Sequence, residues 1–438
     1  MKNISSNSVI STVWRTFYTL GNLKFAITLL LCIAFITSIG TVVEQDRSES
    51  FYKINYPEHN PALGFLSYNL ILFLGLDHVY KTFWFFSLLI IFVLSLFSCT
   101  LARQIPSMKL AKLWRFFKRE NFTRVKENKF LLKDSSLNHL SYLLRTKGYN
   151  IIQQNSNLYA YKGFIGKVGP IIVHFSIILV LFGSVYGILT GYMAQEIIQK
   201  GDLFYPQNFI SKGILASVKQ DFVSYVKDFK IAYSDQGSVD QFYSELQTID
   251  PGLKINSKRI IFVNQPFRYK GVTFYQTDWA ISSLQFLDDN GRKSIARLKE
   301  ISIKNGLRFW IGPVKTKNST EKFLLLEDLT GNCLISTKEK KILGLQEIGS
   351  KIFLNGKVLR VQKIIPATGL QLKLDPGVPI IYTGFFILIF SVFSSYLSYS
   401  QVWALKEKNN LYIYAMTNRG LYFFEKFLIS TLQTLRKK

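Results

Sequence analysis

The sequence predicts a polytopic α-helical membrane protein with four transmembrane helices, three near the N-terminus and one near the C-terminus, and a large β-rich domain on one side of the membrane. Four apolar runs of about 19–22 residues predict the helices, because each is long enough to cross about 30 Å of hydrocarbon. They cover residues 25–43, 83–101, 168–189 and 379–399. Residues 190–377 predict the separate domain, because they contain short runs of branched and aromatic residues that are typical of strands.

The distribution of Lys and Arg predicts the orientation of these spans. Residues 102–167 contain 14 basic and three acidic residues, segment 1–24 contains three basic residues and no acidic ones, and the tail 400–438 contains seven and two. The loop 44–82 has instead three basic against five acidic residues. The positive-inside rule therefore places the first three segments on the inner side and the loop 44–82 on the outer side. Residues 190–377 are then expected on the outer, lumenal or periplasmic, side.

The charge of the chain excludes some functional classes and leaves others open. The net charge is +26, and its densest part is the inner loop 102–167, beside two spans. We interpret this loop as a region attracted to anionic lipid, with a docking surface for an anionic ligand or partner as the alternative. Nucleic-acid binding is disfavoured, because the basic residues match no motif that reads nucleic acid.

The cysteines disfavour redox chemistry between thiols. The sequence has only Cys32, Cys99 and Cys333, and no two of them form a Cys-x-x-Cys motif. A dithiol site and a zinc site of the usual spacing are therefore not expected.

Two segments of the first half allow more than one interpretation. The first span could be a cleaved signal sequence, but its apolar run continues through Val43, which favours a retained anchor. Residues 63–76 are mostly apolar and too few to span the membrane. We predict that they form an interfacial helix on the outer surface, within the outer loop 44–82.

The domain 190–377 is predicted to be β-rich. Asn290-Gly291 and Asn355-Gly356 are sequences typical of hairpin turns. Asp375-Pro376-Gly377 is expected to end the sheet before the fourth span. The predicted strands are 259–263, 272–277, 283–287, 323–326, 351–354, 358–364 and 371–374.

His174 is the candidate site residue, because the predicted spans otherwise avoid ionisable groups. It lies about six residues into the third span, roughly 9 Å from the inner end at 1.5 Å per residue. A polar side chain at that depth usually has a partner or a ligand. The imidazole is either hydrogen-bonded to a nearby carbonyl or hydroxyl, or it binds a metal such as haem iron. His78 lies at the outer boundary, where an interfacial role is expected, and no carboxylate pair or nucleophile completes a catalytic site.

Four blocks of the sequence occur together in one known family. The blocks are residues 29–45 ending in Gly40-Thr41-Val42-Val43-Glu44-Gln45, residues 78–100 beginning with His78-Val79-Tyr80-Lys81-Thr82, Gly169-Pro170-Ile171-Ile172-Val173-His174 with Gly183, and the set Val263–Gly271, Phe274–Trp279 and Asp375–Pro379. With the layout of the spans, this ordered set resembles the ResB/CcsB family of System II c-type cytochrome biogenesis, of the plastid and cyanobacterial type. The resemblance covers nearly the whole chain.

The resemblance implies a function in haem delivery. Members of the family act with a second membrane protein, CcsA, which carries a tryptophan-rich haem-handling motif. That pair moves haem b across the membrane and presents it to apocytochromes c on the outer side. The six Trp residues of this chain are scattered, so the chain resembles the non-catalytic subunit of a holocytochrome c synthase complex. By the family pattern, His174 would be one axial ligand of the haem iron, CcsA would supply the other, and His78 is a less favoured ligand.

The resemblance also implies a compartment. The thylakoid membrane of a plastid (chloroplast) is favoured, with a cyanobacterial thylakoid or a bacterial inner membrane as the alternative. Two other functions remain open on the residues alone. One is an assembly scaffold that binds apocytochrome or CcsA without ligating haem. The other, a small-solute transporter, is disfavoured because a lone intramembrane His lacks the convergent polar groups of such proteins.

Overall fold

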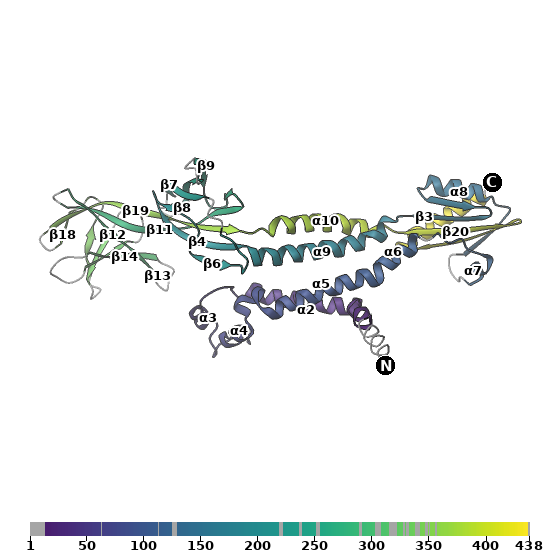
Figure 1. Ribbon diagram of the computed structural model, residues 1–438, viewed down its shortest axis with the longest axis horizontal. Helices are drawn as coiled ribbons and strands as arrows, with labels where there is room; N and C mark the ends of the chain where they lie inside the picture. The colour runs from purple at the N-terminus through teal and green to yellow at the C-terminus, as the bar shows by residue number, and fades with distance from the viewer. Residues whose placement is uncertain are drawn as a thin grey trace, which may run out of the picture. The chain divides into compact units, whose positions relative to one another are not determined.

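The chain forms two compact units, one of Met1–Ser184 with Pro379–Lys438 and one of Val185–Val378 (Figure 1). The computed structural model describes residues 14–62, 64–112, 114–124, 129–218, 222–235, 239–250, 255–288, 291–302, 308–314, 322–326, 329, 333–337, 342–346, 349, 351–354 and 357–436.

Four helices in the described residues are long and apolar enough to cross a membrane, as predicted. The second of them continues beyond the predicted span, because a π-helical turn, η2, joins it to a further helix without a break. The elements are α2 (Leu23–Val42), α5 (Phe83–Cys99), η2 (Thr100–Gln104), α6 (Ile105–Lys112), α9 (Ile165–Thr190) and α10 (Val378–Tyr396).

Glycine and serine residues allow α9 and α10 to lie side by side (Figure 1). A Cβ atom at Gly169 would lie 2.6 Å from the backbone of Ser395, and one at Gly384 would lie 2.7 Å from the side chain of Val180. Small residues at such positions let two membrane helices approach closely, so that packing rather than the hydrophobic effect holds them together.

The outer loop differs from the predicted interfacial helix. Residue 63 lies outside the described residues, and the helix α4 covers only Tyr68–Leu74. It ends at Gly75, which adopts a left-handed conformation with φ of 68° and starts the separate 3₁₀ helix η1 (Leu76–Lys81). The expected helix 63–76 is therefore wrong in length, because a glycine in this conformation ends an α-helix. A further short helix, α3 (Glu49–Asn55), precedes it.

The second unit is β-rich, as predicted, and its sheets are antiparallel. The largest sheet has the order β10-β11-β19-β4-β6, with β12 and β18 on its edges; β5-β7-β8-β9 and β13-β14-β15-β16-β17 form two others. The strands are β4 (Tyr192–Gln199), β5 (Leu203–Phe204), β6 (Phe209–Lys212), β7 (Val223–Tyr233), β8 (Val239–Ile249), β9 (Ile255–Ile261), β10 (Phe267–Tyr269), β11 (Val272–Asp288), β12 (Lys293–Arg297), β13 (Lys299–Ser302), β14 (Arg308–Val314), β15 (Lys322–Leu326), β16 (Cys333–Thr337), β17 (Ile342–Gln346), β18 (Lys351–Leu354) and β19 (Lys357–Leu374).

Two long strands replace pairs of shorter predicted ones. The segments 272–277 and 283–287 belong to one strand, β11, and 358–364 and 371–374 belong to β19. The β11–β19 ladder absorbs the interruptions as register shifts between Gln276 and Asp278 and between Ile281 and Ser283. Asn355-Gly356 lies outside the described residues; β18 and β19 pair antiparallel, with Leu354 opposite Lys357.

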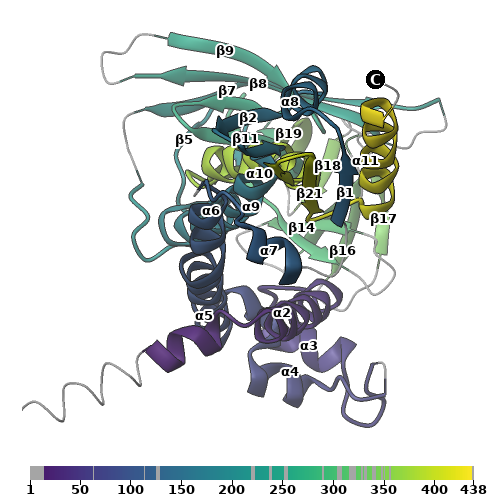
Figure 2. The same cartoon turned by 90° about the vertical axis from the view of Figure 1, so that its right-hand side faces the viewer.

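The segments predicted to lie on the inner side form a folded domain, called here the inner domain, which the sequence did not predict. Strands from the predicted loop 102–167 and from the tail 400–438 make one antiparallel sheet of order β1-β21-β20-β3-β2. Figure 1 labels β3 and β20 of this sheet, and Figure 2 labels β1, β2 and β21. Its elements are β1 (Lys129–Lys133), β2 (Asn150–Gln154), β3 (Asn157–Lys162), β20 (Ser400–Glu407) and β21 (Asn410–Thr417), with the helices α7 (Arg119–Arg124), α8 (Leu137–Thr146) and α11 (Leu421–Arg436).

This sheet buries apolar side chains on both faces. The helices α8 and α11 share one core with Leu411 and Ile413 of β21. On the other face, Phe122 of α7 packs with Tyr159 and Trp403. The basic character of the segment 102–167 therefore coexists with a core, and the description of this segment as a loop is wrong.

Candidate functional site

Two side chains from the π-helical turn η2 hold the imidazole of His174. The Oγ1 atom of Thr100 lies 2.9 Å from Nδ1, and the Nε2 atom of the Gln104 amide lies 3.3 Å from the ring Nε2. His174 lies on α9, so the contacts join the end of the second predicted span to the third. A π-helical turn inserted into a longer helix is often found at a functional site.

The hydrogen bonds assign the tautomer of His174. The Thr100 hydroxyl has two acceptors for its own proton, the backbone carbonyl of Leu96 at 2.9 Å and Oε1 of Gln104 at 3.4 Å, so its oxygen can accept a hydrogen bond from Nδ1 of His174. The Gln104 amide can only donate through its nitrogen, so Nε2 of the imidazole must accept. The ring is therefore neutral, with its proton on Nδ1 and a lone pair on Nε2.

This arrangement fits an axial ligand of haem iron. Histidine ligands of metals usually donate their second ring N–H to a fixed acceptor, which sets the tautomer and orients the ring, and Thr100 is such an acceptor. The lone pair of Nε2 is covered only by a 3.3 Å bond from a neutral amide, which a metal would replace. The same hydrogen bonds also give both ring nitrogens of His174 a partner without any ligand, as the structural interpretation requires.

The structure does not bring His78 to His174. His78 lies in η1, just before α5, whereas Thr100 and Gln104 lie just after it. The 17 residues of α5 span about 25 Å at 1.5 Å per residue. His78 is 47% exposed and its Nδ1 lies 2.8 Å from Oδ2 of Asp77. The Asp77 carboxylate would orient the His78 ring for a ligand. His78 precedes the start of α5, however, whereas the residues that contact His174 follow its end.

Gln45 positions the segment that carries His78. The Gln45 amide donates to the carbonyl of Leu76 at 2.8 Å and accepts from the N–H of Val79 at 3.0 Å. Lys81 also pairs with Asp46 at 2.7 Å. The first two sequence blocks of the family resemblance therefore meet in space, and their role here is to connect the end of α2 to η1.

Thr100 and Gln104 are the site residues that sequence reasoning missed. Thr100 closes the second sequence block and Gln104 follows it by four residues, in a segment read only as the start of a basic loop. The available signal was a pair of polar residues spaced by four directly after an apolar span, which places both on one face of a continuing helix.

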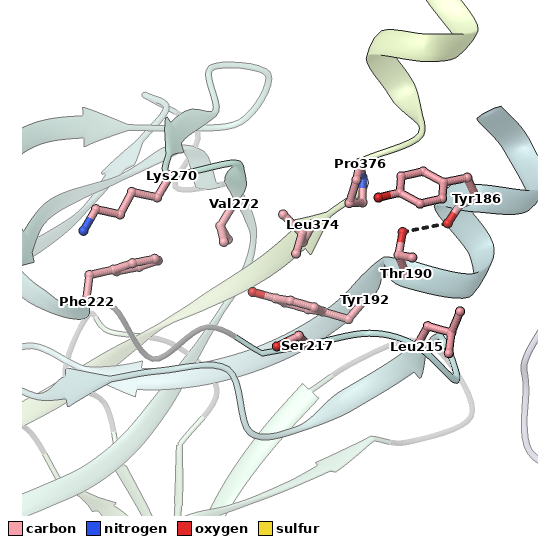
Figure 3. Close-up of a pocket in the computed structure, with 10 residues that line it drawn as sticks. All are labelled: Tyr186, Thr190, Tyr192, Leu215, Ser217, Phe222, Lys270, Val272, Leu374 and Pro376. Carbon is pink, nitrogen blue, oxygen red and sulfur yellow. Dashed lines mark hydrogen bonds between the residues drawn. The ribbon is translucent and has the colours of Figure 1, made fainter.

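A cavity of about 340 Å³ lies in the β-rich unit, beside the end of α9 (Figure 3). Tyr186, Tyr192 and Phe222 supply aromatic surface, and the Lys270 side chain points away from Tyr186 and Tyr192. The Lys270 ammonium lies 2.9 Å from Asp250 Oδ1, so its charge is already compensated. The cavity is mainly apolar and shows no convergent set of polar groups. Among the described residues, no group of three His, Cys, Asp or Glu side chains could hold a metal ion.

Comparisons with known proteins identify the family. Residues 23–318 match the model of the ResB-like family. The chain is 46% identical over 422 residues to "Cytochrome c biogenesis protein Ccs1" of Rhodomonas salina, covering 95% of this chain and 96% of the relative. It is 39% identical to the protein of the same name from Pyropia yezoensis, with 95% and 94% covered. It is 41% identical to "Cytochrome c biogenesis protein CcsB" of Microcystis aeruginosa, with 96% and 95% covered. The chain is thus a multi-pass membrane protein that belongs to the ResB-like family.

Proposed function

We propose that this chain is a membrane subunit of a cytochrome c haem-attachment complex. In this proposal it acts with a CcsA-type protein to move haem b across the membrane and to present it to apocytochromes on the lumenal or periplasmic side. The names of its relatives support a role in cytochrome c biogenesis. The observation that carries the haem role is the His174 imidazole, which keeps the Nε2 lone pair directed at a displaceable amide.

The residues have separate tasks in this proposal. His174 holds the iron of the transported haem through Nε2, and Thr100 fixes the ring through Nδ1. The CcsA-type partner supplies the second axial ligand. Haem, as the cargo, supplies the vinyl groups to which the cysteine thiols of an apocytochrome add. The chain itself is then a non-catalytic subunit, and its outer β-rich unit is a candidate surface for the apocytochrome.

The proposed compartment is the thylakoid membrane of a plastid, with a cyanobacterial thylakoid or a bacterial inner membrane as the alternative. The relatives support it, because they come from the algae Rhodomonas salina and Pyropia yezoensis and from the cyanobacterium Microcystis aeruginosa. The orientation follows the positive-inside rule, with residues 102–167 on the stromal or cytosolic side.

Purification with the CcsA-type partner, followed by absorbance spectra, tests the proposal. We expect the wild-type complex to show a haem Soret band, and His174→Ala to lose it while the complex stays intact. His139→Ala is the matched control, because His139 lies on α8 of the inner domain rather than in a span. Added imidazole is expected to restore part of the band in His174→Ala by filling the vacated ligand position.

An assembly scaffold without haem ligation is the second candidate function. The observation that favours it is the complete hydrogen bonding of the neutral His174 imidazole in the absence of a ligand. In that case His174→Ala would leave both the Soret band and the level of holocytochrome unchanged. This outcome would replace the haem-ligand proposal with the scaffold.

A further inference from the structure

Lys167 is a cation without a carboxylate partner in the first turn of α9. It is half-buried, its Nζ lies 3.4 Å from the hydroxyl of Ser107, and it lies 5.6 Å from the centre of the Tyr399 ring. Within the part of the chain that the structure describes, no carboxylate lies at ion-pair distance from it. Lys167 lies at the N-terminal end of α9, where a positive charge opposes the helix dipole. The first turn of α9 contains no acidic residue that could compensate this charge. An unpaired cation in such a place is costly unless an anion joins it.

A second cation contacts the ring next to the one that Lys167 contacts. The ammonium of Lys112 lies 5.6 Å from the centre of the Phe164 ring, and the rings of Phe164 and Tyr399 meet edge to face at 6.5 Å. Two lysines thus flank one aromatic pair. A cavity of about 500 Å³ opens on the Lys112 side of this pair, and Lys112, Trp114, Tyr161 and Phe164 contribute to its lining, whereas Lys167 and Tyr399 do not. Basic and aromatic surface in one cavity suits a ligand with a flat apolar body and an anionic edge.

Lys167 lies on the same seam as the His174 site, between α9 and the continuous helix of η2 and α6. Along α6 and η2, Ser107 contacts Lys167 and Gln104 contacts His174. Along α9, Lys167 and His174 are seven residues apart, which is two turns on one face and about 10 Å. One ligand lying along this seam can therefore place a metal at Nε2 of His174 and a carboxylate at Lys167.

We propose that Lys167, assisted by Lys112, binds the propionate carboxylates of the haem whose iron His174 holds. The inference rests on the proposed function and adds the orientation of the haem, with its acidic edge toward the inner end of α9. Each ion pair would replace a solitary cation by a charge-assisted hydrogen bond, which is about twice as strong as a neutral one. The phosphate of a membrane lipid has a similar negative charge, but unlike haem it contains no metal that His174 could bind at the other end of the seam.

Haem and its dimethyl ester distinguish this role from a structural one. Both ligands carry the same iron, but the ester has no carboxylates. They are titrated separately into the complex of this chain with its CcsA-type partner after removal of haem, and binding is followed at the Soret band. We expect the wild type to prefer haem, and Lys167→Met to bind haem roughly tenfold more weakly, as the loss of one charge-assisted bond implies. Its affinity for the ester should not change.

Three further variants complete the test. Lys167→Arg should retain the preference for haem, and Lys112→Met should show a smaller loss in the same direction. Lys109→Met is the matched control, because Lys109 is an exposed lysine of α6. We expect it to bind both ligands as the wild type does.

Two results would overturn the inference. One is an equal loss of haem and ester in Lys167→Met, which would show a structural role. The other is unchanged haem binding with weaker binding of the variant complex to vesicles containing phosphatidylglycerol, which would assign the lysine to a lipid headgroup. If His174→Ala loses both ligands while Lys167→Met loses neither, the proposed function stands and this inference falls. If His174→Ala loses neither ligand, the proposed function itself falls.

Discussion

Thr100 Oγ1 accepts a hydrogen bond from Nδ1 of His174 at 2.9 Å and thereby joins the π-helical end of one membrane helix to the next. The hydroxyl has other acceptors for its own proton, the carbonyl of Leu96 at 2.9 Å and Oε1 of Gln104 at 3.4 Å. The ring therefore keeps its lone pair on Nε2, the atom that faces Gln104. The two neighbours of the imidazole have opposite consequences for a metal. Thr100 keeps the Nε2 lone pair available for the metal, whereas Gln104 forms a hydrogen bond with that lone pair.

Thr100→Val should weaken haem binding without removing the ligand. Valine keeps the shape of threonine but cannot accept a hydrogen bond from Nδ1. The imidazole of His174 therefore loses its fixed tautomer and some of its basicity. Loss of such a second partner typically costs 10–100-fold in metal affinity. We expect a lower haem content per complex and a changed iron–histidine vibration in the resonance Raman spectrum. Thr100→Ser should restore both, and a variant with a wild-type Raman signal would contradict the assigned hydrogen bond.

Gln104→Leu should have the opposite effect. The amide must leave Nε2 before iron can bind, and a neutral hydrogen bond contributes about 1 kcal/mol, so its removal should raise haem affinity roughly fivefold. The double variant Gln104→Leu, His174→Ala is the control, because it should bind no more haem than His174→Ala alone. Weaker binding in Gln104→Leu would show instead that the amide supports the bound state.

The membrane helices were predictable from sequence, and the inner domain was not. An apolar run of about 20 residues is a local signal that few other structures produce. The inner sheet depends on strands far apart in the sequence: β3 pairs with β20, so that Tyr159 lies opposite Trp403. Neither strand shows from its own sequence which strand it pairs with. The lysines and arginines around β1 to β3 instead indicated a loop attracted to anionic lipid.

The site was predictable in part for the same reason. His174 is visible in the sequence because it is an ionisable residue in an apolar run. Thr100 and Gln104 become its partners only through the packing of α9 against the continued second span, and the π-helical turn that presents them has no strong local signature. The sequence shows Lys167 as one charge of a basic segment. Its contact with Ser107, rather than with an acidic residue, could not be predicted from the sequence.

Gly169→Val should prevent α9 and α10 from packing. A Cβ atom at this position would lie 2.6 Å from backbone atoms of Ser395, which cannot rotate away. Overpacking of this kind costs typically 1–3 kcal/mol, and both helices must separate to relieve it. We expect reduced accumulation in the membrane and a lower thermal midpoint in detergent. Ile172→Val, at an exposed position of α9, should accumulate normally, and equal stability of the two variants would contradict the close approach.

Trp403→Ala should unfold the inner sheet on the side of α7. The indole stacks on Phe117 at 4.6 Å and on Tyr414 at 5.3 Å, and its N–H donates to the carbonyl of Arg115 at 3.0 Å. Truncation of a buried tryptophan costs about 3–5 kcal/mol. Limited proteolysis of inverted vesicles should then cut the segments 114–124 and 400–417 faster. Tyr142→Ala, at a position 66% exposed, is the control, and unchanged cleavage in Trp403→Ala would mean that the segment contributes little to the fold.

The outer loop should become less ordered in acid because of Glu44. The hydroxyl of Tyr56 donates to Oε2 of Glu44 at 2.6 Å, and this bond holds the pKa of the carboxyl below 4.5, while burial and the carboxylate raise the pKa of Tyr56 to about 12. A carboxyl whose pKa is lowered by folding stabilises the folded form above its unfolded pKa, and the contribution is lost as the pH falls through the folded pKa. Hydrogen exchange of α3 should therefore accelerate below about pH 4.5. In Tyr56→Phe, which lacks the donor, this acid step should shrink, and an equal step in both proteins would assign it to another group.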